Sequence, residues 1–387
     1  MWLVQRAPEA GVKRVVDRLS GSVCGVADGG KPSDEQLLMA RSFTQASQKV
    51  PVVIRASAMS AASGGTGATV ATPRVVFLVM SAVAPQATVD QLAASLAPHI
   101  ALVHHDFSQT PEFQLASPNV RWVPQPRRTG WANFGFVEGI FHSMRHALEH
   151  LDFDYLQLLS PTCLPIRPMR EFESHVGGTC DAHFDCIDLI GDPDALMTVG
   201  YRAFTPDGTL RHRVLRRLTA EYFGQSPGRR DVAGVWLRTG QAAGLLPWVA
   251  RAMVHAFRHP AVGRHVFGES FHPYYGSTWF GARRKVIADM LALFSRPEIH
   301  GYFSRLRIAD EFLIPTMLKH LGVHQGPSNH FIQRFEDAHT GKFEDQHIEQ
   351  LRQSGAYFAR KFADEASAPV RAKVLRELAG MREPVVR

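Results

Sequence analysis

The sequence predicts an α/β protein in which a mostly parallel central sheet is flanked by helices. A continuous apolar run at Arg74–Met80 is typical of a buried parallel strand. Between residues 74 and 190, apolar strands alternate with helical patterns, as in βαβ units. Several prolines that begin at Pro161 follow the strand at Tyr155–Leu159, so the chain leaves the sheet there. Ligands of open α/β sheets bind at this carboxyl edge, although an ordinary turn after a core strand would show the same pattern.

The individual elements follow from the spacing of apolar residues. Thr88–Leu96 has the spacing of an amphipathic helix, and apolar side chains at helical intervals predict another helix over Phe136–Leu151. Residues 191–266 carry paired basic residues without a strict period, so no element is predicted there. Further strands are predicted at Ile100–Asp106, Val120–Val123, His183–Leu189 and His330–Phe335, and further helices at Lys285–Phe294, Asp310–Leu321 and Glu344–Gln353.

The two ends of the chain differ from its middle. Residues 1–72 include a run of small side chains that can bury little surface, so we expect a mostly disordered extension. One ordered domain is predicted over residues 73–365, although a length of 387 residues would also suit two or three domains. Residues 366–387 have the pattern of a basic helix and tail, better suited to docking on the domain than to anchoring in a membrane.

Composition narrows the classes of function modestly. The formal net charge is +7, but lysines and arginines are scattered or paired, so no nucleic-acid partner is expected. The four cysteines form no zinc-type pattern and suit free thiols in a reducing compartment. No stretch approaches the roughly 20 apolar residues of a membrane span, and the N-terminus lacks the apolar core of a signal peptide. We therefore expect a cytoplasmic protein, with peripheral contact at the inner membrane face as a further expectation.

Five short blocks follow one another in an order that can be compared with known families. They are Trp131–Glu138 (WANFGFVE), Ser160–Pro165 (SPTCLP), Gly276–Phe280 (GSTWF), Asp310–Leu318 (DEFLIPTML) and Ala359–Phe362 (ARKF). Together they resemble the core-2/I-branching glycosyltransferase family, which also includes the peptide xylosyltransferases. The Ser-Pro-Thr-Cys-Leu-Pro form is more similar to a plant-type branch of that family. Each block alone is a weak signal, whereas five in the same order make the resemblance specific over residues 74–365.

The resemblance implies a GT-A-like nucleotide-sugar-binding fold and an inverting transfer of a sugar from a UDP-sugar to a hydroxyl acceptor. It implies no essential metal and no other cofactor. The sugar would be N-acetylglucosamine or xylose, and the acceptor a glycan, glycolipid or protein hydroxyl, in polysaccharide or glycolipid synthesis. Such an enzyme needs a carboxylate that takes the proton of the acceptor hydroxyl. The resemblance assigns this role to Glu311, with Asp310 capping or orienting it; otherwise the pair suits an ordinary helix start.

The leaving diphosphate must also be neutralised. Asp152-Phe-Asp154 has the letters of a metal-binding Asp-x-Asp, but it precedes the strand and so lies at the opposite end from the expected site. We therefore predict no metal site and assign the diphosphate to basic side chains. The resemblance indicates Lys361, with Arg334 as a second cation and Arg360 as a solvated neighbour only.

The remaining candidates would contact the nucleotide and the two sugars. The resemblance places four of them against the nucleotide: His105, Asp106, Trp131 and Asn133. A turn-forming aspartate and a core tryptophan are the alternatives for Asp106 and Trp131. Candidates for the donor and acceptor pocket belong to the matched blocks: Thr162, Cys163, Gly276, Ser277, Trp279 and Asp310. Animal members of the family have aspartate where this chain has Cys163, so the identity of the donor sugar stays open.

Two other classes of function are compatible with the sequence. A catalytically silent protein that binds nucleotides or glycans on the same scaffold would account for the departure at Cys163. A glycoside hydrolase would need two carboxylates that flank one glycosidic bond, whereas only Glu311 stands out. Substituting Glu311 by glutamine separates a catalyst from a silent scaffold, because only a catalyst would lose turnover while keeping its ligand.

Overall fold

The computed structural model describes residues 72–81, 84–240, 243–332, 342–362 and 367–381. Within them, the main sheet has seven strands: β1 (Val75–Met80), β2 (Ile100–His104), β3 (Val120–Trp122), β4 (Tyr155–Leu159), β6 (Ala182–His183), β11 (Gly281–Arg283) and β12 (Gln325–Gly326). Their order is β12-β6-β11-β4-β1-β2-β3, and β11 alone among them runs antiparallel to its neighbours. The predicted mostly parallel sheet is confirmed.

Helices lie on both faces of this sheet and in the segments that follow it. In chain order they are α2 (Gln86–Ser95), α3 (Phe134–His150), α4 (Met169–Val176), α5 (Pro193–Phe204), α6 (Leu210–Phe223), α7 (Leu245–Phe257), α8 (Pro260–Gly263), α9 (Arg284–Phe294), α10 (Pro297–Phe303), α11 (Asp310–His320), η1 (Asp345–His347), α12 (Ile348–Gln353) and α13 (Ala368–Glu377). Smaller sheets pair β7 (Cys186–Asp188) with β10 (Tyr274–Gly276), β8 (Gly228–Val232) with β9 (Val235–Thr239), and β14 (Phe358–Arg360) with β13 (His330–Ile332) and β5 (Leu164–Pro165).

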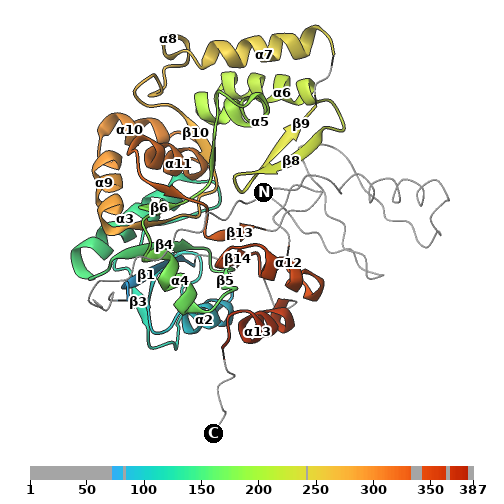
Figure 1. Cartoon of the computed structure of the whole chain (residues 1–387). Helices are drawn as coiled ribbons and strands as arrows, with labels where there is room; N and C mark the ends of the chain where they lie inside the picture. Colours follow the sequence, from blue (N-terminus) through green and yellow to red (C-terminus); the bar gives the residue numbers. More distant parts are fainter. Residues whose placement is uncertain (1–71, 82–83, 241–242, 333–341, 363–366, 382–387) are drawn as a thin grey trace, which may run out of the picture. The chain divides into compact units, whose positions relative to one another are not determined.

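Strand β1 shows why the sheet is covered on both faces. Alternate side chains of a strand point to opposite faces, and every side chain of β1 is buried. One set, which includes Leu78, packs in a core with α3, α9 and α11. The other set, which includes Phe77, packs in a second core with α2 and α4. The continuous apolar run therefore forms a central strand between two helical layers (Figure 1).

The second half of the chain differs from the prediction in two places. The single strand predicted at His183–Leu189 is two short strands, because β6 pairs in the main sheet whereas β7 pairs with β10. Residues 191–266, where no element is predicted, hold α5 to α8 and the β8–β9 hairpin. The extension predicted at residues 1–72 lies outside the described residues except for Thr72.

The C-terminal helix α13 packs on the rest of the chain. Val370, Val374 and Leu375 are buried in a core that also contains Leu164 of β5. The guanidinium of Arg371 donates hydrogen bonds to the carbonyls of Phe362 and Thr88, and to the side chain of Gln91. This arrangement agrees with the predicted docking of the helix on the domain.

Candidate active site

A cavity of about 610 Å³ lies at the carboxyl ends of β1 and β4. Met80 ends β1, and Ser160, Pro161 and Thr162 directly follow β4; all four line the cavity. The end of β14, the loop before α3 and the start of α11 complete the wall. Parallel strands end at the same edge of a sheet, so segments far apart in the sequence meet here. The cavity lies where the prolines after Tyr155–Leu159 predict a ligand site.

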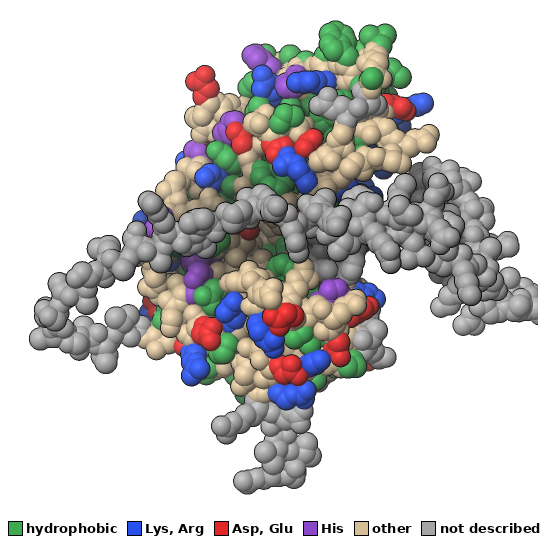
Figure 2. Space-filling model, turned by 45° about the vertical axis from the view of Figure 1, so that its right-hand side comes forward, with side chains coloured by type: hydrophobic (Ala, Val, Ile, Leu, Met, Phe, Trp, Pro, Cys, Tyr) green, Lys and Arg blue, Asp and Glu red, His purple; other side chains and the backbone are tan. Residues whose placement is uncertain are grey.

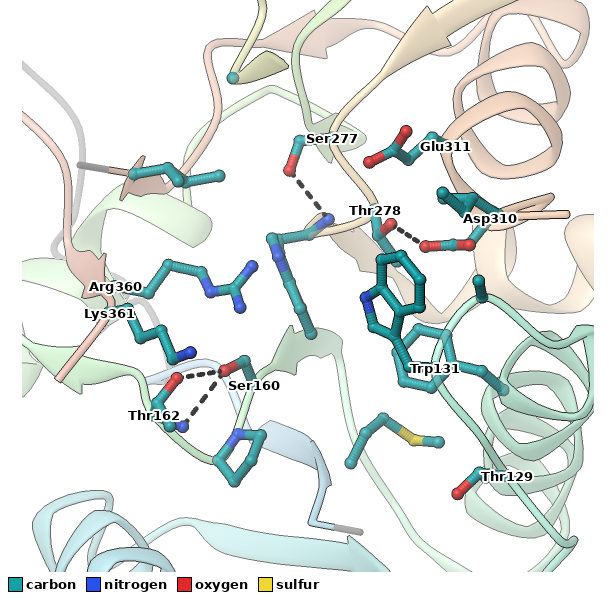
Figure 3. Close-up of a pocket in the computed structure, with 18 of the residues that line it drawn as sticks. Thr129, Trp131, Ser160, Thr162, Ser277, Thr278, Asp310, Glu311, Arg360 and Lys361 are labelled. Carbon is teal, nitrogen blue, oxygen red and sulfur yellow. Dashed lines mark hydrogen bonds between the residues drawn. The ribbon is translucent and has the colours of Figure 1, made fainter. Parts of the chain in front are cut away.

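Charged side chains of opposite sign face each other across this cavity. Figure 3 shows Asp310 and Glu311 on one side, and Arg360 and Lys361 on the other, with their side chains directed inward. The acidic pair starts α11, whereas the basic pair lies at the end of β14. The fold thus brings together two of the blocks on which the family resemblance depends.

Glu311 is held in place by two partners from other elements. Its carboxylate accepts hydrogen bonds from the hydroxyl of Tyr275 at 3.0 Å and from the guanidinium of Arg202 at 3.3 Å. Burial disfavours the charged form of Arg202, but the neighbouring Tyr275 and Glu311 raise its pKa above the ordinary value. The Glu311 side chain is 28% exposed, so it is oriented and still accessible from the cavity. Neither Arg202 nor Tyr275 could be predicted as a site residue, because neither lies in a recognisable local motif.

Asp310 is the first residue of α11, and the N-cap position that the sequence suggested for it is occupied by Ala309. Instead, its carboxylate accepts a hydrogen bond from the hydroxyl of Thr278, which also lines the cavity. Burial and the adjacent charge of Glu311 raise the pKa of the Asp310 carboxyl to about 6. Asp310 is therefore a second ionisable group next to Glu311, and it changes charge near neutral pH.

The basic side of the cavity contains one residue more than expected. Lys361 lines the cavity as predicted, whereas Arg360, expected to be a solvated neighbour, is half-buried and lines it as well. The Arg360 guanidinium lies over the ring of Trp279, 4.7 Å from its centroid. Two cations therefore face the acidic pair. Arg334, the other predicted diphosphate ligand, lies outside the described residues.

The two candidates at the end of β2 lie behind the cavity wall. Ser108, Gln109 and Thr129 donate hydrogen bonds to the buried Asp106 carboxylate. Burial opposes its ionisation, but these hydrogen bonds outweigh burial and lower the pKa of Asp106 well below the usual range. His105 stacks on a phenylalanine ring and contacts Ser81 and Thr110 through its ring nitrogens. Gln109 and Thr129 line the cavity, so Asp106 positions lining residues.

Trp131 and Asn133 lie on the loop that leads into α3. The Trp131 indole lines the cavity and is 81% exposed, so the alternative of a core tryptophan is wrong. Arg307 lies 5.0 Å from the centroid of its ring. Asn133 is exposed at the start of α3 and does not line the cavity. Their assignment to the nucleotide remains a prediction.

The predicted pocket residues divide into cavity lining and core. Thr162, Ser277 and Trp279 line the cavity, and the Ser277 hydroxyl accepts a hydrogen bond from the Trp279 amide. Cys163 is completely buried in the core with β1 and α2, and burial raises the pKa of its thiol. At Gly276, an added Cβ would lie 2.4 Å from the carbonyl of Asp185, so this glycine permits strand pairing. Cys163 and Gly276 thus support the pocket from behind.

The two aspartates of the Asp-x-Asp sequence pair with an arginine outside the cavity. Asp152 and Asp154 precede β4, at the end opposite the cavity, and both form ion pairs with Arg74. Their predicted place at the opposite end is confirmed. Among the residues that the structure describes, no cluster of three histidine, cysteine or acidic side chains is arranged to hold a metal ion.

Comparison of the chain with protein-family models and with curated proteins found no match. The chemistry of the cavity therefore follows from its own side chains. It offers a carboxylate oriented by Arg202 and Tyr275, a second carboxyl with a raised pKa, and two cations on the facing wall. These groups can accept a proton on one side of a bound ligand and neutralise an anion on the other.

Proposed function

We propose that this chain is an inverting glycosyltransferase with a GT-A-like fold, which moves a sugar from a UDP-sugar to a hydroxyl acceptor. One observation carries the proposal: the Glu311 carboxylate faces the Arg360 and Lys361 cations across a single cavity (Figure 3). An inverting displacement needs a base on the acceptor side and stabilisation of charge on the leaving-group side. The order of the five sequence blocks supports the same class of enzyme.

In the proposed reaction, Glu311 takes the proton of the acceptor hydroxyl. The acceptor oxygen attacks the anomeric carbon of the sugar, and the bond from that carbon to the diphosphate breaks. The bonding electron pair leaves with UDP, which gains one negative charge. Arg360 and Lys361 neutralise this charge through charge-assisted hydrogen bonds to the phosphates. The products are a glycoside of inverted configuration, UDP, and a protonated Glu311.

We propose that the enzyme needs no metal ion, because Arg360 and Lys361 line the cavity and supply two positive charges for a diphosphate. The sequence resemblance favours N-acetylglucosamine or xylose as the sugar. It also favours a role in polysaccharide or glycolipid synthesis, with a glycan, glycolipid or protein hydroxyl as the acceptor. Trp279 and Trp131 supply aromatic faces of the kind that pack against sugar rings.

Calorimetry with a panel of UDP-sugars tests this proposal directly. UDP-N-acetylglucosamine, UDP-xylose and UDP-glucose would each be titrated into the full chain, with and without EDTA. We expect one of them to bind more tightly than UDP alone, and equally well in the presence of EDTA. Loss of binding with EDTA would contradict the metal-independent account, and binding of none would contradict the donor class.

The cysteine at position 163, where animal members of the family have aspartate, is also compatible with a catalytically silent scaffold. Because Cys163 is buried behind the cavity wall, its difference from the animal enzymes does not remove a side chain from the cavity. The silent scaffold predicts UDP-sugar binding without release of UDP when any hydroxyl acceptor is added. Detection of UDP by chromatography in a single-turnover reaction would exclude it.

We also propose that the protein rests on an anionic membrane surface. No helix among the described parts of the chain has both the length and the apolar composition needed to cross a bilayer. On α7, however, Leu245 and Trp248 are 74% and 67% exposed, and Figure 2 shows hydrophobic side chains gathered where α6 and α7 lie. Arg251 of α7 and Arg217 of α6 are exposed arginines on the same two helices. Apolar and basic groups together suit the headgroup region of anionic lipids.

Flotation with lipid vesicles tests the membrane contact. The full chain should float with vesicles that contain phosphatidylglycerol and much less with phosphatidylcholine alone, and the double substitution Leu245→Ser, Trp248→Ser should abolish flotation. A matched substitution of the buried-face residue Ala250→Ser on the same helix is the control. Flotation that is unchanged in the double variant would rule out α7 as the contact.

A further inference from the structure

A second cavity, of about 670 Å³, adjoins the first. Trp131, Val235, Ile308 and Glu311 line both, so Glu311 lies in the wall between them. Most of the other lining residues of the second cavity come from α5, α6 and the β8–β9 hairpin, which lie in the upper part of Figure 1. Tyr275 of β10 and Arg307 before α11 complete its lining. This volume is in the range of cavities that bind small ligands. In the proposed reaction, it is the space from which an acceptor reaches Glu311 without displacing the donor.

Positive charge dominates the lining of this second cavity. Five arginines line it, one each from α5, α6, β8, β9 and the segment before α11: Arg202, Arg216, Arg229, Arg238 and Arg307. Glu311 is the single acidic residue among the described lining residues. A solvated basic helix face would place its arginines along one element. Convergence from five elements on one hollow is instead typical of a site for an anion.

Most of this charge is not neutralised within the described residues. Arg202 pairs with Glu311, whereas Arg216, Arg229, Arg238 and Arg307 form no ion pair with any described residue. Arg238 and Arg307 lie over aromatic rings, which hold their guanidiniums without supplying negative charge. Guanidinium groups bind carboxylate and phosphate oxygens in pairs, so an external oxyanion is the ligand that these groups suit.

Aromatic side chains accompany the arginines. Trp131, Tyr201 and Trp236 line the same cavity and are at most half-buried, so they offer planar faces to a ligand. Planar faces pack against sugar rings, and guanidiniums bind oxyanions, which together describe an acidic glycan. We propose that the second cavity binds the acceptor, and that this acceptor is a glycan carrying carboxylate or phosphate groups. That this ligand is the acceptor rests on the proposed glycosyltransferase function. That the cavity binds an anion follows from its lining residues and does not depend on that function.

Binding to defined acidic and neutral sugars tests the anion site. Tetragalacturonate and its methyl ester differ in the carboxylate charge, and glucose 6-phosphate and glucose differ in the phosphate. Calorimetry on the full chain should show binding of an acidic member and about tenfold weaker binding of its neutral partner. Binding confined to tetragalacturonate identifies a carboxylate site, and binding confined to glucose 6-phosphate identifies a phosphate site. Equal affinity within both pairs would overturn the proposal.

Substitutions locate the site. Arg216→Gln and Arg229→Gln should each weaken binding of the acidic sugar about fivefold, as expected for one partly exposed ion pair. Arg217→Gln is the matched control, because Arg217 lies on α6 next to Arg216, is exposed and does not line the cavity. An effect of Arg217→Gln equal to that of Arg216→Gln would mean that general surface charge binds the sugar, and the proposal would be wrong.

Titration of UDP on the same variants separates this proposal from the proposed function. UDP affinity should be unchanged in Arg216→Gln and Arg229→Gln, and weakened in Lys361→Gln. UDP binding that depends on Arg216 and Arg229 but not on Lys361 would place the diphosphate in the second cavity and overturn the inference. If no UDP-sugar binds while the acidic sugar still binds through Arg216 and Arg229, the glycosyltransferase proposal fails and the anion site stands.

Discussion

The end of β2 and the start of α11 both place carboxylates near the first cavity, but the carboxylate after β2 is enclosed by hydrogen-bond donors whereas Glu311 of α11 lines the cavity. Five donor groups from Ser108, Gln109 and Thr129 surround the Asp106 carboxylate, which is buried behind the cavity wall. At α11, Glu311 is held by two partners and still lines the cavity. The difference shows that a carboxylate near a ligand site is available for chemistry only when its oxygens are not already committed to the fold.

The largest expected effect concerns Glu311, the carboxylate left accessible. Glu311→Gln keeps the size and the hydrogen bond from Tyr275 but removes the proton acceptor, so turnover should fall by about a thousandfold. UDP-sugar affinity should stay within about twofold, because the proposed contacts to the diphosphate come from Arg360 and Lys361 on the facing wall. Single-turnover release of UDP measures the turnover, and calorimetry measures the UDP-sugar affinity. Full activity in the variant would show that another group is the base.

Asp106 should show the opposite pattern, with loss of stability as the main effect. Asp106→Asn replaces one carboxylate oxygen, which accepts hydrogen bonds, by an amide nitrogen, which donates them. This change should lower the free energy of unfolding by about 3 kcal/mol. Because hydrogen bonds lower the pKa of Asp106, its contribution is present above the unfolded value of about 4 and is lost as the pH falls below it. Urea denaturation at several pH values measures this, with the exposed Glu112→Gln as control. A pH-independent gap between variant and parent would contradict this account.

The contribution of Asp310 to the free energy of unfolding should change with pH in the opposite direction to that of Asp106. Its raised pKa of about 6 means that, between pH 4 and 6, the folded state retains a proton that the unfolded state has lost. The free energy of unfolding therefore falls as the pH rises through this window. Asp310→Asn removes the buried charge and should stabilise the protein by about 2 kcal/mol at pH 8, with little effect at pH 4. Parallel stability curves for variant and parent would show that the carboxyl is not perturbed.

The smallest effect extends the comparison to cations. Arg74 is committed to Asp152 and Asp154 at the far end of β4, whereas Arg360 and Lys361 line the cavity. Arg360→Gln and Lys361→Gln should each weaken UDP binding about tenfold, a loss typical of one charge-assisted contact. Arg74→Gln should lower stability slightly and leave UDP affinity unchanged. Calorimetry that finds equal losses for all three would mean that the effect is a general one of net charge.

The sequence predicted the parts of the fold whose pattern is local. Strands such as β1 and β4 are continuous apolar runs, and α3 has an apolar stripe at helical spacing, so both could be recognised. Helix α6 could not, because two of its buried positions are His212 and Thr219, which interrupt the apolar stripe. Its exposed arginines further hide the period.

The candidate site could be predicted only where a short block contained the residue. Glu311, Lys361, Ser277 and Trp279 were found in this way and line one cavity. Arg202 could not be found, because its role depends on an ion pair with a residue 109 positions further along the chain. Such long-range pairs have no local signal, and the same holds for the five arginines of the second cavity.

The wall shared by the two cavities has a consequence for the order of events in catalysis. Most lining residues belong to only one of the two cavities, whereas Glu311 lines both. In the proposed enzyme, donor and acceptor would therefore be bound at the same time, and neither would have to leave before the other binds. Steady-state rates measured against both substrates should give intersecting double-reciprocal lines, the pattern of a ternary complex, instead of the parallel lines of a covalent sugar–enzyme intermediate.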